Sequence, residues 1–198
     1  MKKIFLLLSI TLFSFLHSFA QFKYLKQAKE AINDKKYEVA IEKIEKYQKK
    51  EGINTGFYYL KFLLNNAIDN DINKVDSANF YLTLSINEFS KLSVKEKESI
   101  CKELNFCEVN NILLTNNFQN KVYHTYCDNK SEENINLFID KYPYNSNYAT
   151  AEKLRDSVEF ERIVATGSPK EIGMFIKRRP NSIFINSAYV KLHQIEFN

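Results

Sequence analysis

A short phrase occurs twice in this sequence, and its two copies begin 37 residues apart. The first copy, INLFIDKYPYNS, begins at Ile135, and the second, IGMFIKRRPNS, begins at Ile172. In each copy apolar residues at i, i+3 and i+4 form one stripe of a helix, and Pro143 or Pro180 then stops that helix. A repeat of roughly 20 to 50 residues is typical of helical units that cover each other's apolar faces. The repeat therefore predicts an all-α chain built from helical hairpins.

Capping residues complete each predicted hairpin. Ser131 is the expected N-cap of one helix, and Asn145 or Ser146 is the expected N-cap of the next. Gly167 should end that second helix because glycine takes the left-handed conformation without steric cost. Residues 168–171, SPKE, then predict a capping box with proline at the first helical position. The Asn-Ser pair after each proline is shifted by one residue, so the copies are related rather than identical.

A related unit is expected near the N-terminus, in residues 22–50. Its small and apolar residues keep helical spacing on both sides of Asn33-Asp34, with Tyr24, Ala28 and Ala31 before the break and Tyr37, Ala40, Ile41, Ile44 and Tyr47 after it. Ala28, Tyr37 and Ala40 occupy the small, aromatic and small positions of a tetratricopeptide repeat, which this segment resembles. The segment departs from that pattern at Lys35, where glycine is usual, and it lacks the proline that ends the second helix.

The C-terminal copies also resemble tetratricopeptide-like hairpins of bacterial envelope proteins, whose first helix often ends in a Phe-x-x-x-Tyr-Pro phrase. That phrase begins here at Phe138 and is followed by Asn145 and Ser146. Proteins with such hairpins include outer-membrane assembly lipoproteins and periplasmic coordinators of envelope machinery. The resemblance covers residues 22–50 and 131–197. It implies a helical-repeat solenoid that binds other proteins, and it carries over no catalytic residue.

The middle of the chain predicts four further helices. Their expected ranges are 57–67, 75–92, 94–104 and 108–126. The third should begin with a capping box at residues 93–96, SVKE, and the fourth is indicated by the spacing of Val109, Ile112 and Leu113. The expected total is about ten helices, or five hairpins.

The first twenty residues predict an export signal. Lys2 and Lys3 precede a largely apolar run, and Ser18-Phe19-Ala20 forms a small-x-small cleavage site. Cleavage after Ala20 would leave residues 21–198 as one helical repeat domain, whose clearest repeats are 22–50, 131–167 and 168–197. The alternative is an uncleaved anchor. The protein is expected to be periplasmic or secreted, with no membrane span after cleavage.

Composition argues against two common functions. Without Lys2 and Lys3 the chain has 26 basic and 24 acidic side chains, a net charge of +2. Nucleic-acid binding would need a concentrated basic face. The basic cluster at residues 177–179 is expected to stabilise a helix C-terminus, and acidic pairs such as Glu159 with Glu161 should be solvated. Only four glycines occur, too few for a glycine-rich phosphate loop.

Three cysteines and one histidine define the alternative hypotheses about chemistry. Cys107 and Cys127 could form a disulfide in an oxidising compartment, although buried thiols are slightly favoured. Cys101, Cys107, His124 and Cys127 could ligate zinc, but a C-x5-C spacing is unlike the close cysteine pairs of structural zinc sites. A His124–Cys127 dyad would provide a nucleophile with its base, yet no oxyanion loop accompanies it.

Four residues are candidates for binding a partner. Tyr58 and Tyr59 are adjacent on one predicted helix, so one of them should be exposed. Leu137 and Met174 are equivalent in the 37-residue repeat and lie off the main stripe, where they either pack between repeats, the favoured alternative, or line a groove. We therefore expect a non-enzymatic scaffold that binds proteins of unknown identity and needs no cofactor. The alternatives are a zinc- or thiol-dependent protein and a self-associating structural element of the cell surface.

Overall fold

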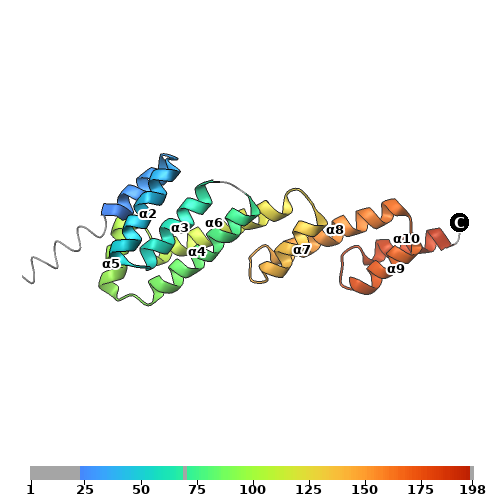
Figure 1. Ribbon diagram of the computed structural model, residues 1–198. Coiled ribbons are helices and arrows are strands. Elements are labelled where there is room, and N and C mark those ends of the chain that lie inside the picture. Colours follow the sequence, from blue (N-terminus) through green and yellow to red (C-terminus); the bar gives the residue numbers. More distant parts are fainter. Residues whose placement is uncertain (1–22, 69–70, 197–198) are drawn as a thin grey trace, which may run out of the picture. The chain divides into compact units, whose positions relative to one another are not determined.

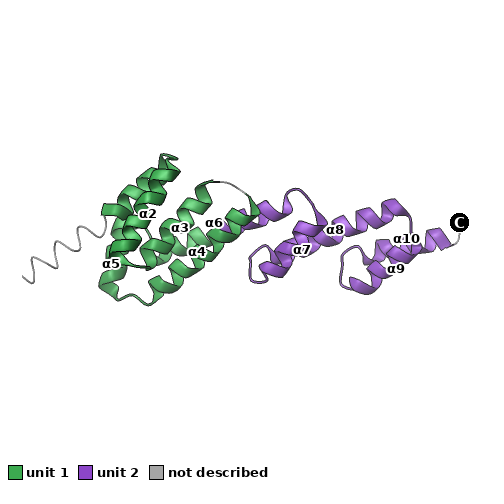
Figure 2. Ribbon diagram, in the orientation of Figure 1, with its two compact units in different colours: residues 1–115 green, residues 116–198 purple. Residues whose placement is uncertain are grey.

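The computed structural model describes residues 23–68 and 71–196 of the chain. The described residues form ten helices and no strand, which confirms the predicted all-α class (Figure 1). Their contacts divide the chain into two compact units, residues 1–115 and 116–198 (Figure 2). None of the described helices combines the length and the hydropathy needed to cross a bilayer. The predicted export signal, residues 1–20, lies outside the described residues.

Unit 1 contains a helix over residues 23–33, four complete helices after it and the start of a sixth. These are α2 (Tyr37–Glu51), α3 (Thr55–Ile68), α4 (Ile72–Ser90), α5 (Val94–Leu104) and the first part of α6 (Glu108–Cys127). The predicted middle helices differ from the observed ones by three residues or fewer at each end. The capping box at the start of α5 is confirmed, because the Ser93 side chain accepts a hydrogen bond from the Glu96 N–H and Glu96 binds the Ser93 N–H.

The first hairpin, made of helix 23–33 and α2, is built as expected around small residues. Ala28 and Ala40 are fully buried, so the two helices can approach closely. Lys35 lies in the turn between them with φ +59°, the left-handed conformation that favours glycine. The expected burial of Ile41 is wrong, since its side chain is exposed on α2 beside the buried Ile44.

A close approach of three helices fixes the start of α3. A Cβ atom added at Gly56 would lie 3.0 Å from the Tyr47 hydroxyl oxygen and 3.1 Å from either terminal methyl of Leu25. The Tyr47 hydroxyl donates a hydrogen bond to Oδ1 of Asn54 over 2.9 Å, and the same oxygen accepts the Phe57 N–H. Gly56 therefore has no room for a side chain.

Unit 2 contains the rest of α6 and two helical hairpins. The hairpin helices are α7 (Glu132–Lys141), α8 (Tyr148–Thr166), α9 (Pro169–Arg178) and α10 (Ile185–Glu196). Helix α7 packs against α8, α9 packs against α10, and α8 also contacts α9. The expected N-caps Ser131 and Ser168 and the left-handed Gly167 are confirmed. Only half of the second capping box forms, because the Glu171 carboxylate accepts a hydrogen bond from Thr166 instead of the Ser168 N–H.

The two hairpins repeat the same backbone hydrogen bonds at an offset of 37 residues. In each bond the N–H of the first residue named donates to the carbonyl oxygen of the second. The bonds of the first hairpin are Ile135 to Ser131, Tyr142 to Phe138, Asn145 to Tyr142, Tyr148 to Asn145 and Ala151 to Asn147. Their counterparts, in the same order, are Ile172 to Ser168, Arg179 to Phe175, Ser182 to Arg179, Ile185 to Ser182 and Ala188 to Phe184. The residues that end α7 and α9 also share their conformation, with φ/ψ of −126°/53° and −124°/53°. The two segments therefore form one structural unit built twice.

This equivalence confirms the one-residue shift of the Asn-Ser pair after the prolines. Asn145 and Ser182 occupy the same position, both are buried, and each side chain accepts a hydrogen bond from the backbone N–H two residues later. Either side chain can make this bond, so the chain conserves the bond rather than the residue. The expected cap of α8 at Asn145 or Ser146 is wrong, since Asn147 holds the N-cap position.

Candidate interaction surfaces

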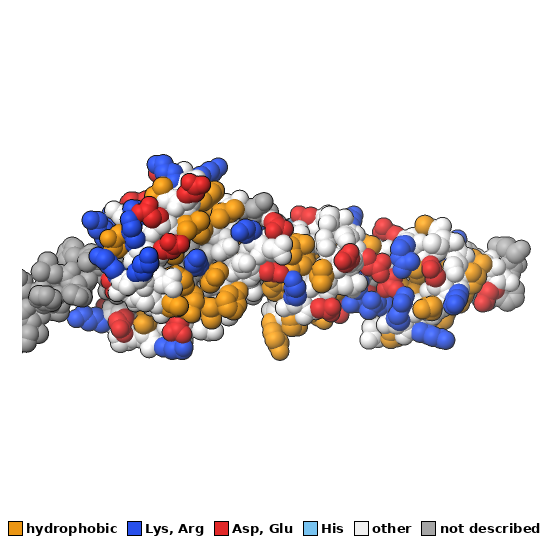
Figure 3. Space-filling model, viewed as in Figure 1, with side chains coloured by type: hydrophobic (Ala, Val, Ile, Leu, Met, Phe, Trp, Pro, Cys, Tyr) orange, Lys and Arg blue, Asp and Glu red, His pale blue; other side chains and the backbone are white. Residues whose placement is uncertain are grey.

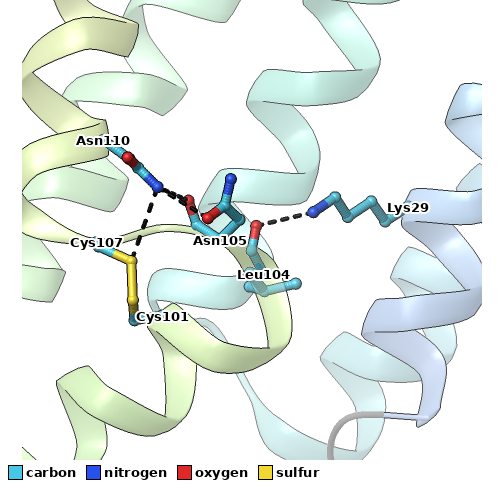
Figure 4. Close-up of a disulfide and its surroundings, with 6 residues drawn as sticks. All are labelled: Lys29, Cys101, Leu104, Asn105, Cys107 and Asn110. Carbon is cyan, nitrogen blue, oxygen red and sulfur yellow. Dashed lines mark hydrogen bonds between the residues drawn. A yellow bond between two sulfur atoms is a disulfide. The ribbon is translucent and has the colours of Figure 1, made fainter.

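Cys101 and Cys107 form a disulfide at the junction of α5 and α6 (Figure 4). Asn105 between them takes the left-handed conformation at φ +58°, which reverses the chain after α5. The Lys29 ammonium donates a hydrogen bond to the Leu104 carbonyl oxygen over 2.8 Å. Partial burial lowers the pKa of Lys29. The expected buried thiols at Cys101 and Cys107 are wrong, and Cys107 pairs with Cys101 rather than with Cys127.

The loop closed by this disulfide carries part of the unit 1 core. Leu104 and Phe106 are fully buried. The Phe106 ring lies 4.5 Å from the Tyr59 ring centroid and meets the Phe89 ring edge-on at 5.3 Å. The disulfide is therefore structural, because it restrains the loop that inserts these two side chains.

The structure does not assemble the predicted metal ligands or the thiol dyad. The sulfur atoms of Cys101 and Cys107 are bonded to each other, so neither can be a thiolate ligand. No cluster of three or more potential ligands is found within residues 23–68 and 71–196. Cys127 is a buried thiol, as favoured, and burial raises its pKa to about 11. At that pKa the thiol stays protonated, and a protonated thiol is a poor nucleophile. His124 Nδ1 lies 2.9 Å from the Asp128 carboxylate on the exposed side of α6.

The adjacent tyrosines of α3 are placed differently from the prediction. Tyr59 is buried, but Tyr58 is half-buried and its ring stacks on Tyr81 of α4 at 6.4 Å. The exposed aromatic of this group is Phe80, which meets Tyr81 edge-on at 5.5 Å. Sequence reasoning missed Phe80, although its place between the buried Ala78 and Leu82 was a usable signal.

Leu137 and Met174 take equivalent places on α7 and α9, and both side chains are exposed. The favoured alternative, in which they pack between repeats, is therefore not what the structure has. Their exposure makes them surface residues of unit 2 that a partner could contact.

An apolar stripe of α6 also faces solvent. The predicted helix is confirmed, but Val109, Ile112 and Leu113 are 71%, 64% and 57% exposed. The buried side of the helix begins at Asn111 and continues through Phe118, Val122 and Tyr126. Residues 109–120, VNNILLTNNFQN, contain no charged side chain. We call Val109, Ile112 and Leu113 the α6 stripe. The face of unit 1 that Figure 3 presents also carries hydrophobic side chains.

A buried carboxylate joins α8 to α9. Glu159 is only 2% exposed, and its two oxygens accept hydrogen bonds from Arg178 Nη2 over 2.5 Å and Arg179 Nε over 3.1 Å. Arg179 also lies 3.5 Å from the carboxylate of Asp156, which pairs with Arg155 at 3.0 Å. The expected solvation of Glu159 is therefore wrong. Arg178 and Arg179 lie at the end of α9, as expected, and they also bind this carboxylate.

A cleft of about 430 Å³ lies beside this ion-pair group, between α8 and the link from α9 to α10. Its charged lining comes from Glu152, Lys153, Arg155, Asp156, Arg178 and Arg179. Two of these six groups are acidic and four are basic, and both guanidinium groups from the end of α9 are held by Glu159, so the cleft is a polar contact between consecutive hairpins with a small excess of basic groups.

Comparisons with protein-family models, with curated proteins and with solved structures find no significant match to this chain. The function proposed below therefore rests on the residues and their surroundings.

Proposed function

We propose that this chain is an exported protein-interaction scaffold of the bacterial cell envelope, built from stacked tetratricopeptide-like hairpins and lacking catalytic activity of its own. The export signal predicted from residues 1–20 and the twice-built hairpin of unit 2 support this proposal. In such folds each hairpin supplies surface rather than chemistry, and recognition depends on the side chains that the helices leave exposed.

The observation that carries the proposal is the α6 stripe. Three apolar side chains at i, i+3 and i+4, each more than half exposed, lie next to one another on one side of the helix. A partner helix or strand that covered them would gain about 25 cal/mol for each Å² of apolar surface removed from water. The absence of charge in residues 109–120 removes the desolvation cost that a charged neighbour would add.

Site-specific photo-crosslinking in the native envelope tests this function. A photoreactive phenylalanine derivative at Ile112 is expected to give a defined adduct, whereas the same group at the exposed Lys102 of α5 is the matched control and should give none. Leu113→Asp should abolish the adduct without changing the helical circular dichroism, because an exposed side chain contributes little to stability.

Two outcomes would contradict the proposal. Equal adducts at both positions would show that the α6 stripe has no specific partner. An adduct of twice the chain mass would instead support the self-associating structural element.

A further inference from the structure

The charged cleft of unit 2 lies at a junction that the chain builds twice. Lys130 and Gly167 are 37 residues apart, and both are left-handed. The N–H of each donates to the carbonyl oxygen three residues earlier, on Cys127 and Val164. The offset therefore extends back into α6 and α8. We call the contact of the α7–α8 link with α6 the first junction, and the contact of the α9–α10 link with α8 the second junction.

Neutral groups make the contacts between link and helix at the first junction. Asn145 Nδ2 donates a hydrogen bond to the Gln119 carbonyl oxygen over 3.1 Å, and the Ser146 N–H donates to Gln119 Oε1 over 3.2 Å. Asn147 Nδ2 donates to Asn120 Oδ1 over 2.8 Å. Amide groups are thus enough to hold a link of this repeat against the preceding helix.

The second junction has charged residues at the equivalent positions. They are Glu152, Lys153, Arg155, Asp156, Glu159, Arg178 and Arg179, and their counterparts, in the same order, are Thr115, Asn116, Phe118, Gln119, Val122, Lys141 and Tyr142. Only Arg178 has a charged counterpart. A buried ion pair adds little net stability compared with apolar residues of similar volume. The packing of the hairpins therefore does not account for these charges.

The basic side chains of the second junction keep donors for a ligand. Glu159 accepts one N–H from Arg178 and one from Arg179, whereas each guanidinium carries five. The Arg178 side chain is 50% exposed. Within residues 23–68 and 71–196, the exposed Lys153 has no hydrogen-bond or ion-pair partner. All three basic side chains line the cleft of about 430 Å³.

The charge of the second junction indicates the kind of ligand. Its four basic and three acidic side chains leave a net charge of +1, which one carboxylate balances. A phosphate monoester, with a charge of about −1.5 to −2, would exceed this and would lie near the carboxylates of Glu152 and Asp156. Ile183 lines the same cleft and is 70% exposed, so an apolar group beside the carboxylate would find a contact.

We propose that this cleft binds a carboxylate of a partner peptide, supplied by an acidic side chain or by the chain's C-terminus, next to an apolar side chain. This inference rests on the proposed scaffold function and names the chemistry of one partner segment. Arg178 and Arg179 donate N–H groups to the carboxylate oxygens, and Lys153 adds a charge-assisted hydrogen bond. Ile183 covers part of the neighbouring apolar side chain.

Three synthetic peptides are the probes. Acetyl-Gly-Leu-Asp-Gly-Ser-amide carries a side-chain carboxylate, acetyl-Gly-Ser-Gly-Leu carries a C-terminal carboxylate, and acetyl-Gly-Leu-Asn-Gly-Ser-amide is uncharged. Each is titrated into the ¹⁵N-labelled protein while the backbone and arginine Nε–H signals are followed by nuclear magnetic resonance. A carboxylate peptide should cause saturable shifts at Arg178, Arg179 and Ser182, and the uncharged peptide should cause none. The tighter of the two carboxylate peptides identifies the source of the group.

A charge reversal at Lys153 makes the test specific. Lys153→Glu should weaken binding of the carboxylate peptide about tenfold, equivalent to 1.4 kcal/mol, because it places a like charge at the cleft. The fold should be unchanged by circular dichroism, since Lys153 has no partner within the described residues. Lys170→Glu is the matched control and should leave binding unchanged, because it reverses an exposed lysine of α9 that does not line the cleft.

Equal shifts from the uncharged peptide would overturn the proposal, as would no shifts at all or unchanged binding to the Lys153→Glu protein. Inorganic phosphate that displaced the peptide at a lower concentration than acetate would overturn the choice of a carboxylate. Self-association that Lys153→Glu abolished would show that a second copy supplies the group. The Ile112 adduct does not depend on Lys153, so these results leave the scaffold function to its own test.

Discussion

Gly56 is a position where one added methyl group should destabilise the fold. The new Cβ of Gly56→Ala would lie 3.0 Å from the Tyr47 hydroxyl and 3.1 Å from Leu25, and both of these side chains are buried. Overpacking of this kind costs about 1–3 kcal/mol. Displacing Tyr47 would also weaken its hydrogen bond to Asn54, which contributes about 1 kcal/mol.

Helix propensity acts in the opposite direction. Alanine is favoured over glycine by about 1 kcal/mol in a helix interior, but Gly56 is the second residue of α3 and gains less there. We therefore expect a net loss of about 1–2 kcal/mol. Gly173→Ala in α9 is the matched control, because nothing lies within 4 Å of its Cβ position. That change should stabilise the protein by about 0.5–1 kcal/mol.

Urea unfolding followed by circular dichroism and tyrosine fluorescence measures both changes, since the chain has no tryptophan. A double variant, Gly56→Ala with Tyr47→Phe, removes the closest contact, so its cost should be smaller than the sum of the single costs. If Gly56→Ala were as stable as the unchanged protein, the close approach of these three helices would be refuted.

Three further predictions concern the disulfide, one turn and the free thiol. Replacing Cys101 and Cys107 by serine should lower the free energy of unfolding by about 2 kcal/mol, from the entropy of the small closed loop; an unchanged urea midpoint would contradict this. Lys35→Gly should stabilise by about 0.5–1 kcal/mol by relieving the left-handed strain, whereas Lys36→Gly, at negative φ, should destabilise. Cys127, with its pKa raised from 9.0 to about 11, should react with thiol reagents only after unfolding. Its contribution to stability should be complete below pH 9.0 and lost as pH rises towards 11, and rapid native labelling at pH 8 would disprove its burial.

Local signals explain why so much of the helix pattern was predictable. Ser93, Ser131 and Ser168 cap helices where expected, and α7 ends just before Pro143. A cap or a stop involves residues within one turn of each other, so the sequence contains all the groups that take part. The repeated phrase likewise marks a repeated hairpin.

The surface residues show where that reasoning stops. The apolar spacing on α6 correctly indicated a helix, but the buried side of that helix contains Asn111 while Val109 and Ile112 face solvent. Which side is covered depends on the neighbouring helices, and periodicity within one helix does not contain that information. The aromatic group on α3 and α4 was misjudged for the same reason, since Tyr58 is half covered by Tyr81.

The sequence by itself determined the helical class, most of the places where helices begin and end, and the period at which the hairpin recurs, because these depend on groups close together in the chain. The tertiary structure alone decided that Glu159 is buried between two arginines and that Cys101 pairs with Cys107 rather than with Cys127. It also decided which apolar residues remain exposed. Burial and pairing are properties of segments that meet in space, and the free energy of each contact is settled only when both partners are in place.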